Sequence, residues 1–160
     1  MAKIARKFLA HFINTAPTSE PKYERLGKDL EELSTELNPE LETKNNILGE
    51  TSTTLSSYQA QFSVEPYYAD EGTGLHTFLQ DIIDNRKTLD EVKTDVLEVH
   101  MWENQGEGVY VAYKEECIVE ISSYGGDTTG YQIPFNVHLT GNRTKGTFNT
   151  STNTFAKEEF

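Results

Sequence analysis

The chain has a single cysteine, no long apolar run and few positive charges. Because Cys117 is alone, no internal disulfide is possible, which is typical of a protein that folds in a reducing cytoplasm. No stretch approaches the roughly 20 apolar residues of a membrane helix. The N-terminal apolar segment is interrupted by Arg6, Lys7 and His11, and no signal-peptide cleavage site follows it. No membrane partner is therefore expected.

Positive charge is scarce relative to negative charge. The sequence contains 14 Lys and Arg against 26 Asp and Glu, giving a formal net charge of -12. This balance argues against tight binding of nucleic acid, which requires clustered cations that contact phosphates. The one basic concentration comprises Lys3, Arg6 and Lys7, with no acid before Glu20. A basic end on an acidic body can attract a second copy of the chain, which favours self-assembly.

The length of 160 residues predicts one domain spanning residues 1–160. Alternating segments rich in Val, Thr and aromatics predict a mainly β fold of two packed antiparallel β-sheets, sandwich-like or barrel-like, with one flanking α-helix. Long strands are expected at residues 4–13 and at 92–102, with a bulge near 96–97. Residues 109–123 are expected to form one long strand or a pair of strands. A hairpin is expected to pair residues 133–140 with 144–148 across Gly141.

One helix is predicted at about residues 74–86. Its apolar residues recur at the spacing of a single buried stripe on a helix, and they are Leu75, Phe78, Leu79, Ile82 and Ile83. His76 falls on the opposite, polar side. Acids before the segment and Arg86 with Lys87 at its end suit the helix dipole.

An acidic segment lies within a polar region at about residues 30–60. Six acids and no Lys or Arg occur between Asp29 and Glu42, and an Asn38-Pro39 turn signal divides them. Alternation predicts a hairpin about this turn. One face would carry Glu32, Ser34, Glu36, Glu40 and Glu42, and the other would pack Leu33, Leu37 and Leu41 on the sheet and helix. The acidic face either points at bulk water or lines a space that must not bind anions.

No catalytic, cofactor-binding or metal-binding residues are predicted. The spacing of His11, His76, His100, His138 and Cys117 matches none of the close pairs that zinc sites use. Gly72-Thr-Gly74 precedes the helix but lacks the third glycine of a dinucleotide-binding loop, and Gly125-Gly126 lacks the Lys-Ser/Thr of a phosphate-binding loop. Cys117 falls among apolar strand residues, where a buried thiol is more common than a nucleophile.

Five stretches, taken in order, carry a resemblance that covers most of the chain. They are KIARKFLAHFI, YERLGKDLEELSTELNPELETKNNILGE, TLSSYQAQFSVEPYYADEGTG, GLHTFLQDIIDNR and IPFNVHLTGNRTKGTF. In this order they resemble the major tail tube proteins of long-tailed bacteriophages that infect Gram-positive hosts. The NPE-x-E…I-x-x-E phrase within the second stretch is the most specific part.

The resemblance implies a non-enzymatic structural protein of the virion tail, assembled in the host cytoplasm. Such proteins form stacked hexameric rings, and the resulting tube conducts double-stranded DNA from capsid to host without binding it tightly. Partners would be further copies of the chain, the tape measure protein, the terminator and the baseplate or distal tail proteins. On this reading Glu32, Ser34, Glu36, Glu40 and Glu42 line the lumen. Lys3, Arg6 and Lys7 are then candidates for contacts between subunits.

A monomeric β-sandwich binding module is the main alternative. It would recognise carbohydrate or a host surface, with Tyr67, Tyr68, Trp102 or Tyr124 as stacking platforms. Packing in the core or at subunit interfaces is the commoner use of such aromatics. The alternative predicts saturable ligand binding and no polymer. An enzyme ranks third, because no arrangement of carboxylates or nucleophiles stands out.

Overall fold

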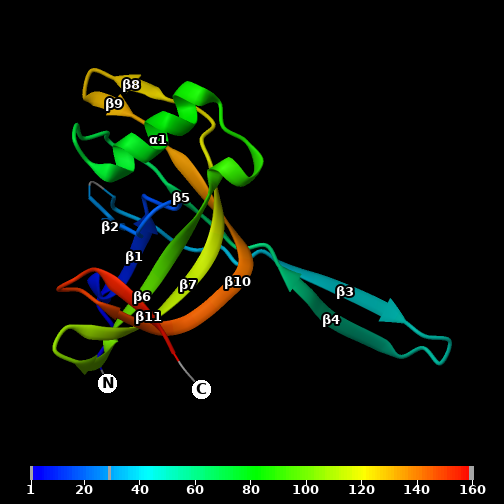
Figure 1. The fold of residues 1–160 in the computed structure, drawn as a ribbon. Coiled ribbons are helices and arrows are strands. Elements are labelled where there is room, and N and C mark those ends of the chain that lie inside the picture. Colours follow the sequence, from blue (N-terminus) through cyan, green and yellow to red (C-terminus); the bar gives the residue numbers. More distant parts are fainter. Residues whose placement is uncertain (1, 29, 159–160) are drawn as a thin grey trace.

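The computed structural model describes residues 2–28 and 30–158. These residues form one α-helix, two 3-10 turns and eleven strands (Figure 1). In chain order the elements are η1 (Arg6–Phe8), β1 (Leu9–Asn14), β2 (Tyr23–Leu26), β3 (Pro39–Asn45), β4 (Thr51–Tyr58), β5 (Gln61–Val64), α1 (Gly74–Asn85), η2 (Leu89–Val92), β6 (Lys93–Gly106), β7 (Val109–Glu120), β8 (Gly125–Asp127), β9 (Gly130–Gln132), β10 (Phe135–Asn149) and β11 (Thr154–Lys157).

The long strands form a curled antiparallel sheet. Its order is β11-β10-β7-β6-β1-β2, and β5 pairs with the first part of β10. Two-stranded ribbons, β3-β4 and β8-β9, complete the described strands. Figure 1 shows α1 and β8-β9 at one end of the long strands and both chain ends at the other. The prediction of a mainly β, sandwich-like fold with one flanking helix is confirmed.

Both faces of the sheet bury side chains, but at different ends. The cluster under α1 takes Val96, Cys117 and Val137 from the sheet. A second cluster on the other face takes Leu97 and Phe148. Side chains alternate across a strand. The buried side chains of β6 therefore lie on one face of the sheet up to Val96 and on the other face from Leu97 onward. The expected bulge near 96–97 is therefore wrong, because the β6-β7 register is continuous from Lys93 to His100.

The helix forms as the apolar period predicted. Leu75, Leu79, Ile82 and Ile83 are buried, and Phe78 packs, partly buried, against the same cluster. At the N-terminus, Thr73 Oγ1 accepts a hydrogen bond from the His76 N–H at 3.2 Å, which satisfies one of the free donors of the first turn. At the C-terminus, Arg86 adopts a left-handed conformation with φ 47°.

The predicted hairpin across Gly141 is wrong. Residues 135–149 form the continuous strand β10, which pairs with β7 along its length. Gly141 has a φ of +91° and lies where the register shifts between Leu139 and Arg143. A β-bulge uses the conformational freedom of glycine just as a turn does, so the local signal was real but the connection was misassigned.

Candidate functional site

The ribbon of β3 and β4, called the arm here (residues 39–58), projects from the side of the body (Figure 1). At its root the backbone N–H of Glu36 donates to Gln61 O at 2.7 Å, and the Gln61 N–H donates to Glu36 O at 2.9 Å. Every residue of both arm strands is exposed. A two-stranded ribbon alone is marginally stable in water, and its exposed edges can pair with another chain. The arm therefore presents an unpartnered surface.

The predicted turn at Asn38-Pro39 does not join the arm strands. Residues 39–45 pair instead with 51–58, across the turn at residues 46–50. Asn38 has a φ of +45°, and its side-chain amide donates to Gln59 O at 3.1 Å. The Asn-Pro signal thus marks the bend where the chain enters the arm, not a hairpin turn.

The two faces of the arm differ in chemistry. One face carries the cross-strand pairs Leu41–Leu55 and Thr43–Thr53. The other carries Glu40, Glu42 and Lys44, and Lys44 Nζ lies 3.3 Å from Glu42 Oε1. The alternation read within residues 39–45 is therefore present in the structure, although the partner strand was misassigned. Both faces meet solvent in the single chain.

The five residues predicted to line a lumen do not lie on one strand. Glu40 and Glu42 share the acidic face of β3, and Glu36 lies at the root of the arm. Glu32 and Ser34 lie in the irregular segment that leads to the arm, where both are exposed. Asp29, the first acid of the run, lies outside the described residues.

The predicted packing of the opposite side is partly wrong. Leu33 is buried in the cluster under α1, but Leu37 and Leu41 are exposed. The reason is geometric: Leu33 precedes the arm and lies against the body, whereas the arm carries Leu41 away from it. These leucines can be covered only by another molecule or by a rearranged arm.

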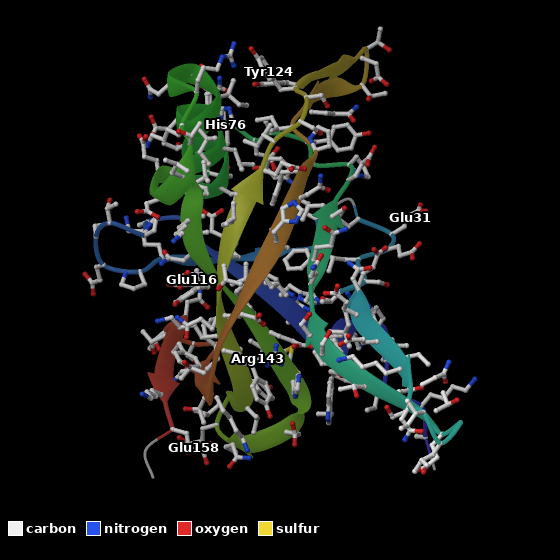
Figure 2. The ribbon with its side chains drawn as sticks, turned by 90° about the vertical axis from the view of Figure 1, so that its right-hand side faces the viewer. Glu31, His76, Glu116, Tyr124, Arg143 and Glu158 are labelled. Atoms are coloured by element: carbon white, nitrogen blue, oxygen red, sulfur yellow. The ribbon has the colours of Figure 1, made fainter. Side chains whose placement is uncertain are left out.

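A basic cavity of about 520 Å³ lies beside the segment that leads to the arm. Arg6, Lys7, Arg25 and Lys28 line it, with Glu31 and Glu32 among the other lining residues. The segment containing Glu31 is visible to the right of the long strands in Figure 2. The cavity carries more cations than acids in a chain whose net charge is -12. It is therefore a surface of opposite sign to the rest of the molecule.

Cations at the cavity bond to backbone carbonyls. Arg6 Nη2 donates to Leu33 O at 2.7 Å, and Arg25 Nη2 donates to Lys7 O at 2.9 Å. Within the described part of the chain, Lys3, Arg6, Lys7 and Arg25 form no ion pair, whereas Lys28 pairs with Asp70 at 2.8 Å. The residues proposed for contacts between subunits thus retain charge that an acidic partner can neutralise.

The first strand begins later than expected. Lys3 precedes regular structure, and Arg6 and Lys7 lie in η1, before β1 begins at Leu9. The expected strand at residues 4–13 is therefore wrong over its first part, which contains Arg6 and Lys7. All three are exposed, and Arg6 also holds the start of the segment that leads to the arm.

A cluster of charged side chains links the strands β6, β7 and β10. Arg143 of β10 binds Glu98 of β6 at 2.8 Å and Glu115 of β7 at 3.1 Å. Figure 2 shows Arg143 along the strands between Glu116 and Glu158. Burial pushes the pKa of Glu98 upward, but the hydrogen bond and charge of Arg143 outweigh it, so the pKa is lowered. Glu115 is buried, and its pairing with Arg143 makes this cluster structural.

The candidate nucleophile and metal ligands lie apart. Cys117 is buried, and burial raises the pKa of its thiol, so it is an inert core residue. His11 is also buried, and burial lowers its pKa to about 4. His76 packs edge-on against Tyr131 instead of facing open solvent. In residues 2–28 and 30–158, no three His, Cys, Asp or Glu residues form a group suited to a metal ion.

The proposed stacking aromatics do not share one platform. Tyr67 packs against the core, edge-on to Phe135. Trp102 is 42% exposed and stacks on His100 with ring centroids 4.6 Å apart. Tyr124 lies near α1 (Figure 2), where Arg86 approaches its ring at 5.8 Å. Tyr124 is also exposed, but Trp102 alone among these three is stacked face to face on a neighbouring ring.

Neither the known family models nor the curated proteins contain a match to this chain. None of the helical segments in the described residues has the length and apolar character needed to cross a bilayer.

Proposed function

We propose that this chain is a structural subunit that assembles with copies of itself into rings and a tube, as the resemblance to phage tail tube proteins implies. One observation carries the proposal: the arm, whose residues are all exposed and whose apolar face lacks any partner in the single chain. A contact between the arm and a different surface on the next copy is heterologous. Repeated around an axis, such contacts close into a ring or continue as a filament.

The acidic face of the arm suits the wall of a channel for DNA. Glu40 and Glu42 point to the same side of β3, with Glu36 at its root. Duplex DNA carries one charge per roughly 1.7 Å, and electrostatic repulsion acts over about 8 Å at physiological salt. Carboxylates on the wall of a narrow bore would therefore keep DNA from adhering. We propose that Glu36, Glu40 and Glu42 face the bore, with Glu32 and Ser34 at its edge.

The basic end supplies a second contact in this proposal. Lys3, Arg6 and Lys7 form no ion pair with the described residues, and Arg6 and Lys7 line the basic cavity together with Arg25. An acidic surface of an adjacent subunit complements them. Because exposed ion pairs are screened by salt, this contact would orient the subunits and weaken as ionic strength rises.

The binding-module alternative is favoured by Trp102, the accessible ring stacked on His100. Carbohydrate binding would use such a ring as a platform. A titration of Trp fluorescence with oligosaccharides tests it, and saturable quenching that is lost in Trp102→Ala would support it. The unpartnered arm has no role in this alternative, so we rank it second.

Negative-stain microscopy of the purified chain, with light scattering over a range of concentrations, tests self-assembly. The proposal predicts rings of uniform diameter, and stacks of rings at high concentration. Discrete monomers alone would argue against it.

A further inference from the structure

The turn at the end of the arm (residues 46–50, the arm tip) presents two bare apolar side chains. Ile47 is 103% exposed and Leu48 is 76% exposed. Turn positions are normally filled by Gly, Asn, Asp, Ser or Pro. The Asn46 side chain accepts hydrogen bonds from the N–H groups of Leu48 and Glu50, at 2.9 and 3.0 Å. These hydrogen bonds order the turn, and Ile47 and Leu48 project from it into solvent.

A groove elsewhere on the molecule has matching chemistry. It lies between the C-terminal end of α1 and strand β7, has a volume of about 760 Å³, and is called the α1 groove here. Its lining includes the apolar side chains of Ile82, Val92 and Ile121, with Tyr124 half exposed at its edge. This volume is within the range of sites that bind small apolar groups.

Leu89 marks the rim of the α1 groove. Its side chain is 84% exposed, and its backbone has a φ of +54°. A leucine rarely adopts this left-handed conformation, because its Cβ crowds the backbone. Strained residues of this kind gather at binding sites. A bare leucine held in a strained conformation therefore points to a contact that the single chain does not make.

We propose that the arm tip of one copy docks into the α1 groove of a second copy, with Ile47 and Leu48 against Leu89 and the apolar lining. This pairing deepens the proposed function and rests on its self-assembly. The charges also match. Glu50, the last residue of the tip, and Arg86, at the groove, form no ion pair within the described residues, so each can neutralise the other across the contact.

The contact joins two chains and does not fold one chain back on itself. Figure 1 shows the arm tip pointing away from α1 and from the end of the molecule that carries it. The contact uses the tip and leaves Glu40 and Glu42 uncovered on the arm. It is thus compatible with an acidic wall of a channel.

Disulfide trapping between two separately purified variants tests the pairing. Leu48→Cys is mixed with Leu89→Cys under mild oxidation, and Thr53→Cys, on the apolar face of the arm, replaces Leu48→Cys as the matched control. Cys117 is buried and does not compete. The expected result is a mixed dimer at least tenfold more abundant than in the control. Equal trapping by both arm variants, or trapping by neither, would overturn the pairing.

Leu89→Gly separates docking from folding. Glycine accepts the positive φ without strain, so the variant is expected to unfold at the same or a higher temperature than the parent. Its association is expected to be about tenfold weaker, because one apolar contact is lost. Ile47→Ser with Leu48→Ser should weaken association about 100-fold by the same reasoning. Unchanged association in both variants would overturn the proposal.

The outcomes also separate this inference from the proposed function. Rings that form without trapping between Leu48→Cys and Leu89→Cys retain the proposed function and reject the docking site. Trapping that yields only closed dimers, with no rings, supports the docking site and rejects the tube. A chain that stays monomeric and is not trapped rejects both.

Discussion

The carboxylate of Glu24 in β2 accepts a hydrogen bond from the backbone N–H of Gly74 at 2.8 Å, and its second oxygen accepts one from the Leu75 N–H at 3.0 Å. These N–H groups belong to the first turn of α1, which has no partners for them within the helix. A negative charge at this end also complements the helix dipole. Glu24 thus fixes the helix to the edge of the sheet.

Replacing Gly74 should break this link. A Cβ at position 74 would lie 2.7 Å from Glu24 Oε1 and 2.9 Å from Thr15 Oγ1, so the carboxylate must move. Alanine has a higher helix propensity than glycine, which alone would stabilise the helix. We nevertheless expect Gly74→Ala to lower the free energy of unfolding by roughly 1 kcal/mol, because the hydrogen bonds of Glu24 are disturbed. Urea denaturation measures this. In a Glu24→Ala background the same substitution should be neutral or stabilising, and additive effects in the double variant would contradict the mechanism.

The stability of the chain should fall in acid through His11. Burial lowers its pKa in the folded state to about 4, whereas an unfolded histidine titrates near 6.5. Between these values the unfolded chain binds a proton that the folded chain does not. The loss therefore begins as the pH drops below 6.5 and is complete near 4, amounting to about 3 kcal/mol.

Denaturation of the parent and His11→Phe at pH 7, 5.5 and 4 isolates this effect from the titration of the carboxylates. The difference in unfolding free energy between the two proteins should shift in favour of the variant as the pH falls. A constant difference across the three pH values would show that His11 is not responsible.

Arg143→Met should destabilise the sheet by roughly 3 kcal/mol, because it leaves the buried carboxylate of Glu115 without its charged partner. The double variant Arg143→Met with Glu115→Gln should recover part of the loss. Thermal and urea unfolding measure both. A small effect of the single variant would mean that the Gly141 N–H, which donates to Glu115 Oε2 at 3.0 Å, is enough to stabilise this carboxylate without Arg143.

Removing the arm should leave the body folded. Glu36 and Gln61 are already hydrogen-bonded across the root, so replacing residues 38–59 by Asn-Gly closes the chain with a short hairpin turn. The arm strands are exposed throughout, and we expect the unfolding free energy to change by no more than about 1 kcal/mol. Self-association should be lost. An arm-deleted chain that still forms rings would remove the arm from the assembly mechanism.

Local patterns in the sequence predicted those parts of the fold that local forces determine. Leu75, Leu79 and Ile82 recur with the 3.6-residue period of a helix that is buried on one side, and α1 buries all three. The period of two within residues 39–45 likewise predicted β3 and its acidic face. Lys3, Arg6 and Lys7 could be identified as a basic group from charge alone.

Strand pairing was not accessible in the same way. Asn38 and Gly141 both adopt the positive φ that their neighbourhood suggested, yet one begins the arm and the other sits in a bulge of β10. A turn signal reports backbone conformation, whereas the partner of a strand depends on contacts far along the chain. The basic cavity could not be predicted for the same reason, because only the pairing of β1 with β2 brings Arg25 and Lys28 close to Arg6.

Reversing charge on the acidic face should make the proposed tube adhere to DNA. Glu36→Lys with Glu40→Lys changes exposed side chains, so folding and assembly are expected to persist. Assembled variant tubes should retain short duplex DNA in a salt-sensitive manner, as measured by co-sedimentation, whereas parent tubes should not. Glu71→Lys with Glu107→Lys, which changes the net charge equally at other exposed sites, is the control. Equal retention by both variants would contradict an acidic bore.

A cryo-EM reconstruction of the assembled particle would locate residues 39–58 relative to neighbouring copies and would show whether the arm lines a channel. We predict that the acidic side of the arm, with Glu40 and Glu42, faces an enclosed channel, while the arm contacts an adjacent subunit. An arm that is free of contacts on the outside of the particle, or a chain that forms no particle at any concentration, would contradict it.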